Sequence, residues 1–153
     1  MIHPAQDPIA AFKEAFARAQ IRETRDATAM TLATVSVEGR PSARIVLLKA
    51  VDERGFVFYT NFTSRKGREL TARPVAALCF HWPKGEEQVR IEGQVEQVSD
   101  AEADAYFASR PRGSQIGAWA SAQSEVIASR EVLEKAFAEV EARFQGREVP
   151  RQI

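Results

Sequence analysis

Hydrophobic residues follow the helical period near both ends of this chain and the strand period in its middle. Over residues 9–19, apolar side chains recur every three or four positions and predict an amphipathic helix, with Asp7 as its N-cap and Pro8 in the first turn. A second stripe of this kind predicts a last helix over 129–144, with Gly146 as its C-cap. These two segments therefore predict helices with one buried face.

The middle of the chain consists of short β-branched and apolar runs between turns that contain Gly or Pro, a pattern typical of strands. Short turns join the first three runs and predict an antiparallel meander. The run 75–82 is nearly all apolar, so we expect it to be covered on both faces. The last run alternates cleanly and predicts a strand with one exposed face. The predicted strands are 30–37, 42–50, 56–61, 75–82 and 89–96.

Two further helices are predicted, one over 63–73 and one from the capping box of Ser99 and Glu102 to about residue 110. The segment 110–124 is polar and contains glycine, and it predicts a long functional loop. Consecutive hairpin strands with most helices late in the chain predict an α+β fold, in which a small antiparallel barrel or sheet is surrounded by helices.

The composition is that of a globular protein. With 153 residues, 44% of them hydrophobic and 27% charged, we expect a single domain over 1–153. Lys+Arg and Asp+Glu both number 21, so the balance does not favour nucleic acid or a membrane surface. One cysteine excludes an internal disulfide and favours the reducing cytoplasm, and the N-terminus is not typical of a signal peptide.

Positive side chains gather in the stretch 43–67. Arg44 and Lys49 bracket an apolar run at an odd spacing, which would put them on opposite faces of a regular strand. The triplet 64–66, Ser-Arg-Lys, stands where a helix is predicted to begin. Cations there oppose the helix macrodipole unless an anion binds, and a hydroxyl, two cations and free backbone N–H groups suit a phosphate. The alternative is a solvated first turn.

A second group of donors follows later in the chain. Arg110, Arg112 and Ser114 lie within five residues and could hold another phosphate, although a plain polar loop is the alternative. Tyr106 would share a helix face with Arg110 if the helix extends that far.

Signatures of other chemistry are missing from the sequence. Gln88 and Gln123 can donate and accept toward a heterocycle. There is no Ser-His-Asp or Cys-His constellation, no paired-carboxylate signature, no GxGxxG and no Walker A motif. Two histidines and one cysteine do not suggest a zinc site. Phosphate-binding groups with few acids or bases suit a protein that positions a cofactor.

Five segments of the chain together resemble the pyridoxamine 5′-phosphate oxidase family, in the family's order and approximate spacing. RIVLLK and SRPRGSQIGAWASAQS are the specific ones, and the likeness covers about 7–150. The segments are RIVLLK (44–49), VFYTN (57–61), SRK (64–66), QVRIEG (88–93) and SRPRGSQIGAWASAQS (109–124). The resemblance implies an antiparallel, Greek-key-like FMN-binding split β-barrel with surrounding helices, working as a homodimer with FMN at the interface.

The resemblance also implies an activity and a set of site residues. The activity is FMN-dependent oxidation of pyridoxamine 5′-phosphate or pyridoxine 5′-phosphate to pyridoxal 5′-phosphate with O₂ as acceptor, in cytoplasmic vitamin B6 metabolism. No side chain is assigned a catalytic role. By matching positions, the implied FMN-binding residues are Arg44, Ile45, Val46, Leu47, Leu48, Lys49, Tyr59, Thr60, Ser64, Arg65, Lys66, Gln88, Gln123 and Ser124. The implied residues for the substrate phosphate are Lys49, Tyr106, Arg110 and Ser114.

The chain departs from the family pattern at its end. The family continues beyond a Val-Pro segment, here Val149-Pro150, into strands that carry an Arg-x-His pair over the substrate ring, whereas this sequence stops at Ile153. The resemblance therefore implies a domain that is C-terminally short relative to the family. The alternative function is a non-catalytic split-barrel protein that binds FMN and the vitamin phosphate. An FMN reductase is disfavoured, because the Tyr106, Arg110 and Ser114 set matches the vitamin-phosphate site.

Overall fold

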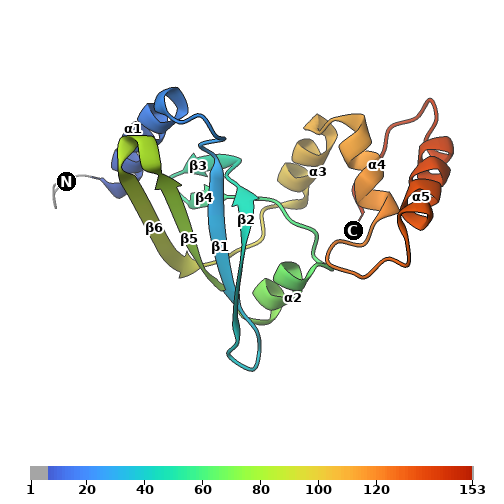
Figure 1. Ribbon diagram of the computed structural model, residues 1–153, viewed down its shortest axis with the longest axis horizontal. Helices are drawn as coiled ribbons and strands as arrows, with labels where there is room; N and C mark the ends of the chain where they lie inside the picture. The colour runs from blue at the N-terminus through green and yellow to red at the C-terminus, as the bar shows by residue number, and fades with distance from the viewer. Residues whose placement is uncertain (1–6, 153) are drawn as a thin grey trace. The chain divides into compact units, whose positions relative to one another are not determined.

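The computed structural model describes residues 7–152, which form helices and antiparallel strands (Figure 1). By their internal contacts, these residues fall into two compact units. The first unit comprises residues 7–60 and 69–95, and the second comprises residues 61–68 and 96–152. Helices and antiparallel sheets occur together, so the predicted α+β class is confirmed.

The first unit is organised around a four-stranded antiparallel sheet. Its elements are α1 (Pro8–Arg22), β1 (Ala29–Val35), β2 (Pro41–Leu47), β3 (Ala50–Asp52), β4 (Gly55–Val57), β5 (Val75–Trp82), the short 3-10 helix η1 (Pro83–Gly85) and β6 (Glu87–Gln94). The strand order of the large sheet is β2-β1-β5-β6, seen side by side in Figure 1, and β3 pairs with β4 in a separate sheet. The register places Leu32 between Arg44 and Leu78.

One face of the large sheet is buried under α1, whose N-cap is Asp7 as predicted. Leu32 and Phe80 are fully buried on this face. The ring of Phe12 from α1 lies 5.1 Å from that of Phe80 and 6.0 Å from that of Trp82, centroid to centroid. The indole N–H of Trp82 donates to the carbonyl of Ala27 at 3.0 Å, so this buried ring keeps its polar atom paired. Aromatic packing therefore joins α1 to the sheet.

The opposite face of the same sheet is open among the described residues. Ile45 is 63% exposed, Leu47 38% and Val75 45%. The prediction that 75–82 is covered on both faces is therefore wrong for residues 7–152, because only alternate side chains of β5 are buried. The predicted half-exposed strand is confirmed in β6.

The predicted antiparallel pairing of consecutive runs is confirmed for β1 with β2 and for β3 with β4, but these strands lie in two sheets because the backbone changes its pairing partner after Leu48. The N–H of Leu48 donates to the carbonyl of Thr28 at 2.9 Å, and the N–H of Lys49 donates to that of Val57 at 2.8 Å. The run 42–50 is therefore divided between β2 and β3, and the run 56–61 forms only the short β4. A continuous apolar run does not show where the backbone changes its pairing partner.

The second unit contains the first turn of α2 (Arg65–Ala72) and three complete helices, namely α3 (Asp100–Ser109), α4 (Arg112–Ala120) and α5 (Arg130–Arg143). Phe107, Ile116, Phe144 and Val149 form its core. The capping box at Ser99 and Glu102 and the N-cap at Ser129 are confirmed. At the C-terminal side, the guanidinium of Arg151 donates to Asp104 at 2.6 Å and to Asp100 at 2.7 Å, which raises the pKa of Arg151.

The prediction of a loop over 110–124 is wrong where α4 stands. Pro111 begins this helix, and the N–H of Gln115 donates to its carbonyl at 3.1 Å. Gln115 and Ile116 are buried, and Trp119 packs against the same core. The helix therefore forms because its apolar face is buried, which outweighs its glycine content.

Among the described residues, helices that combine the length and the apolar character needed to cross a membrane are absent.

We expect Leu32→Ala to lower the free energy of unfolding by about 2–5 kcal/mol, because it leaves a cavity at a fully buried position of β1. The matched control is Ile21→Ala, at a position of α1 that is 87% exposed, and it should change stability by less than about 0.5 kcal/mol. Urea unfolding followed by circular dichroism measures both. Equal effects of the two substitutions would contradict the assignment of the core face.

Candidate functional site

The residue before α2 (Arg65–Ala72), Ser64, holds the backbone at the start of this helix. Ser64 is fully buried, and its hydroxyl accepts from the N–H of Gly67 at 3.2 Å and donates to the carbonyl of Asn61 at 2.6 Å. Ser64 therefore acts as an N-cap, and its side chain stabilises the turn before the helix. Ser64 is one of the predicted FMN residues, and in this fold its side chain also stabilises the start of α2.

Gly67 allows the preceding segment to lie against the helix. A Cβ atom at this position would lie 2.4 Å from the carbonyl oxygen of Asn61 and 2.5 Å from that of Phe62. Both neighbours are backbone atoms, which cannot swing aside as a flexible side chain can. The glycine therefore fixes how closely the 61–63 segment approaches the first turn of α2.

The first turn of α2 consists of Arg65, Lys66, Gly67 and Arg68, so positive side chains gather at the positive end of the helix dipole. Lys66 is only 9% exposed, and its Nζ donates to Oε1 of Gln123 at 2.9 Å. The structure thus brings together two predicted residues that are far apart in the sequence. Ser124 follows Gln123 and has φ of 72°, in the left-handed region.

Arg44 of the first unit is held by protein acceptors at both terminal nitrogens. Its NH1 group donates to the carbonyl of Leu32 at 3.2 Å and to the hydroxyl of Thr34 at 2.6 Å. Its NH2 group donates to the hydroxyl of Ser42 at 2.7 Å and to Oε2 of Glu69 at 3.2 Å. The guanidinium charge is therefore neutralised within this unit by Glu69, a residue that the sequence analysis did not single out.

The neighbouring predicted residues alternate along and after β2. Ile45 and Leu47 lie on the open face, whereas Val46 packs against the core and Leu48 is 5% exposed. Lys49 is exposed and follows the end of the strand. The prediction that Arg44 and Lys49 lie on opposite faces required one regular strand, and this condition is not met because β2 ends at Leu47. The other predicted residues of this unit are half-buried Tyr59 and Thr60 after β4, and exposed Gln88 on β6.

The predicted substrate residues of the second unit lie around the junction of α3 and α4. Tyr106 belongs to α3, which ends at Ser109 with Arg110 as its C-cap, so the condition for a helix face shared by Tyr106 and Arg110 is not met. The guanidinium of Arg110 lies over the ring of Phe107, 5.6 Å from its centroid. Ser114 is exposed in the first turn of α4.

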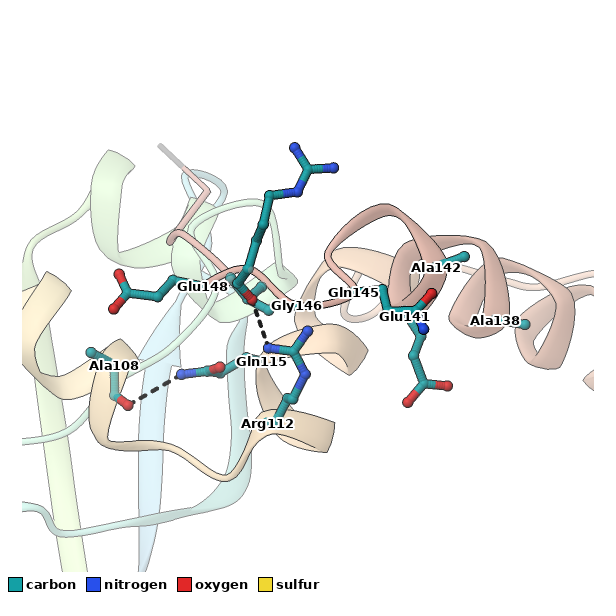
Figure 2. A pocket seen from close by; sticks show the side chains of 11 residues that line it. Ala108, Arg112, Gln115, Ala138, Glu141, Ala142, Gln145, Gly146 and Glu148 are labelled. Atoms are coloured by element: carbon teal, nitrogen blue, oxygen red, sulfur yellow. Dashed lines mark hydrogen bonds between the residues drawn. The ribbon is translucent and has the colours of Figure 1, made fainter.

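Arg112, the other candidate of this group, has a structural role. Its guanidinium donates to the carbonyls of Phe144 at 2.6 Å and Arg147 at 2.9 Å, and so joins α4 to the segment after α5. It lies beside a cavity of about 920 Å³ among α3, α4, α5 and residues 145–149 (Figure 2). Glu141 and Glu148 also line this cavity. Its charges are mixed, so it suits an anion less well than the first turn of α2.

The donor groups at the start of α2 fit a phosphate monoester. Arg65 and Lys66 supply positive charge, and the backbone N–H groups of a helix N-terminus point toward an anion placed there. The carboxamide of Gln123 lies at the same place through its bond to Lys66. Within residues 7–152, the structure shows no group of three or more His, Cys, Asp and Glu that is placed to hold a metal ion.

Comparison with known proteins identifies the family. The family model described as pyridoxamine 5′-phosphate oxidase matches residues 17–144. A relative from Myxococcus xanthus (strain DK1622), named pyridoxine/pyridoxamine 5′-phosphate oxidase, is 62% identical over 151 residues, which are 99% of this chain and 72% of the relative. The chain belongs to the pyridoxamine 5′-phosphate oxidase family. This is a family of oxidoreductases with FMN as cofactor, so the predictions of an enzyme and of FMN are confirmed at that level.

Solved structures agree with the family assignment. PhzG from Burkholderia lata 383, solved with tetrahydrophenazine-1-carboxylic acid, is 34% identical with a TM-score of 0.89, over 97% of this chain and 73% of that chain. A pyridoxamine 5′-phosphate oxidase-related, FMN-binding protein from Nostoc punctiforme PCC 73102 is 21% identical with a TM-score of 0.64, over 88% of this chain and 72% of that chain. The second likeness shows the fold alone. Together with the family match, these likenesses confirm the predicted split-barrel fold.

We expect Gly67→Ala to lower the free energy of unfolding by about 1–3 kcal/mol, because the new methyl group would overlap two backbone carbonyls. Gly113→Ala in α4 is the matched control. Its Cβ would meet nothing within 4 Å, so the change should be neutral or stabilising by up to about 1 kcal/mol. Thermal unfolding compares the two variants. A Gly67→Ala protein as stable as the parent would contradict the close approach.

Proposed function

We propose that this chain is an FMN-dependent oxidase of pyridoxine 5′-phosphate and pyridoxamine 5′-phosphate that forms pyridoxal 5′-phosphate. The observation that carries the proposal is the set of phosphate donors at the start of α2, in a chain whose named relatives are such oxidases. The alcohol substrate and O₂ would give pyridoxal 5′-phosphate and hydrogen peroxide. The amine substrate, O₂ and water would give pyridoxal 5′-phosphate, ammonia and hydrogen peroxide. FMN, when bound, supplies the redox chemistry by accepting a hydride and passing two electrons to O₂.

Arg65 and Lys66 would hold the phosphate of FMN, since charge-assisted bonds to a dianion are stronger than neutral ones. Lys66 is buried and oriented by Gln123, so its ammonium group loses little freedom when an anion binds. Ser64 would support the site by capping the turn before α2. Arg44 would support it through the hydrogen bonds of its guanidinium within the fold. The other proposed FMN residues are Ile45, Val46, Leu47, Leu48, Lys49, Tyr59, Thr60, Gln88, Gln123 and Ser124.

A second set of residues would hold the phosphate of the substrate. Tyr106, Arg110 and Ser114 offer a phenol, a guanidinium and a hydroxyl around the α3–α4 junction, and Lys49 would contribute an ammonium group. The stack of Arg110 on Phe107 limits the rotation of the guanidinium and preorganises its donors. These residues would bind and orient the substrate, and we assign the proton transfers to no side chain.

We further propose a cytoplasmic homodimer with FMN at the subunit interface. The open face of the β2-β1-β5-β6 sheet supports an interface, because Ile45, Leu47 and Val75 expose apolar side chains there. The single cysteine supports a reducing compartment.

Two alternatives can be distinguished by one assay. The likeness to PhzG favours a phenazine-type substrate without phosphate, but the identity to the named oxidase is far higher. The non-catalytic alternative predicts bound FMN without turnover. We expect hydrogen peroxide release with pyridoxine 5′-phosphate and FMN, and none with unphosphorylated pyridoxine at the same concentration. Binding of FMN without peroxide release would support the non-catalytic protein, and absence of flavin binding would overturn the proposal.

We expect Arg65→Ala to weaken FMN binding by about 1.5–3 kcal/mol, because it removes a charge-assisted bond to the phosphate. The control is Arg130→Ala, which removes an exposed arginine of α5 that pairs with Glu134. Flavin fluorescence titration measures both. An unchanged dissociation constant for Arg65→Ala would remove this residue from the site.

We expect Arg110→Ala to raise the KM for pyridoxine 5′-phosphate about tenfold or more, since about 1.4 kcal/mol corresponds to a factor of ten. The dissociation constant of FMN should stay at the parent value, because Arg110 is proposed to bind only the substrate phosphate. Steady-state peroxide assays and flavin titration give the two quantities. A variant that loses FMN affinity and substrate affinity together would contradict the assignment of two separate phosphate sites.

A further inference from the structure

A buried carboxylate of the first unit receives three hydrogen bonds on one oxygen. Glu69 of α2 is 7% exposed. Its Oε2 accepts from the hydroxyl of Thr34 at 2.5 Å, from the hydroxyl of Ser42 at 2.7 Å and from NH2 of Arg44 at 3.2 Å. These partners lie on β1 and β2, so the carboxylate ties α2 to the edge of the sheet. We call Glu69, Thr34, Ser42 and Arg44 the Glu69 network.

The hydrogen bonds that run from Arg44 through the two hydroxyls to Glu69 have a consistent direction. The guanidinium of Arg44 donates to the hydroxyls of Thr34 and Ser42, and each hydroxyl then donates its single proton to Glu69. An ionised Glu69 completes this arrangement, because an ionised carboxylate is an acceptor only. Arg44 supplies the compensating charge at 22% side-chain exposure. The network therefore joins two strands to Glu69 of α2, and the two hydroxyl oxygens lie 3.3 Å from each other.

Helix α2 needs such an anchor. It has eight residues, contains Gly67 and begins with Arg65 and Lys66, whose charges oppose its dipole. A helix of this length has little stability on its own. Within the part of α2 that belongs to the first unit, Glu69 bonds to the strands through the network and Leu70 packs against the core.

We propose that Glu69 is a positioning residue of the FMN phosphate site. This inference rests on the proposed function, in which Arg65 and Lys66 bind that phosphate. Glu69 lies one helical turn after Arg65 on α2, and its network fixes the helix that carries both cations. Glu69 itself touches neither the phosphate nor the flavin. Its removal leaves the cations in the chain but frees the helix on which they stand.

The test compares FMN with riboflavin, which differs from it by the phosphate alone. In Glu69→Gln the side chain keeps its size, but the charge that pairs with Arg44 is lost. We expect the dissociation constant of FMN to rise about tenfold or more, the equivalent of one charge-assisted bond, while that of riboflavin stays at the parent value. Ser42→Ala, which removes one donor to the same oxygen from outside α2, should shift FMN in the same direction by a smaller factor.

The control is Glu134→Gln, which removes a carboxylate from an exposed arginine pair on α5 and should leave both flavins unaffected. Circular dichroism confirms that each variant is folded. A folded Glu69→Gln protein that keeps the parent preference for FMN over riboflavin would overturn the inference, and so would equal losses for both flavins. A parent that binds FMN no better than riboflavin would overturn the proposed phosphate site itself, so the two failures are distinguishable.

Discussion

The pairing of Arg44 with Glu69 inside the first unit is the constraint on which the arrangement of β1, β2 and α2 depends. Both charges are largely removed from water, and each is satisfied by the other and by the hydroxyls between them. Removal of one partner from a buried ion pair typically costs about 3–5 kcal/mol, because the other charge is left uncompensated. The pair therefore constrains the fold more strongly than an exposed pair such as Arg130 with Glu134, which is worth well under about 1 kcal/mol.

Sequence patterns predicted the helices whose first residues include an N-cap side chain. They failed where packing between segments that are distant in the sequence determines the structure. The N-caps of α1, α3 and α5 were legible at Asp7, Ser99 and Ser129, because each side chain bonds to the backbone within three residues. Helix α4 was missed because its stability comes from burial of Ile116 against the core of the second unit. The end of β2 at Leu47 accompanies a change of partner, since the N–H of Leu48 bonds to Thr28 and that of Lys49 to Val57.

The candidate site likewise combines features that local sequence patterns predict with contacts between distant segments that they do not predict. Clustering of Arg65 and Lys66 at a helix start followed from local patterns, as did the likeness of the whole segment to a known family. Contacts across the chain were not legible, and they change the roles of individual residues. Ser64 caps a helix, Arg112 binds backbone carbonyls, and Arg44 is paired with Glu69. A cation in a sequence motif can thus have partners within the fold that the motif does not show.

In a chain without net charge, a site for an anion depends on how the carboxylates are distributed among the cations. Arg44 is neutralised by Glu69, and Arg151 by Asp100 and Asp104, so these cations stabilise the fold. At the start of α2 the buried ammonium group of Lys66 donates to the uncharged amide of Gln123. An amide oxygen orients an ammonium group through a hydrogen bond without adding a negative charge of its own. The carboxylate partners of Arg44 and Arg151 thus tie these cations to the fold, whereas the bond from Lys66 to the Gln123 amide orients an ammonium group that we propose to bind a phosphate.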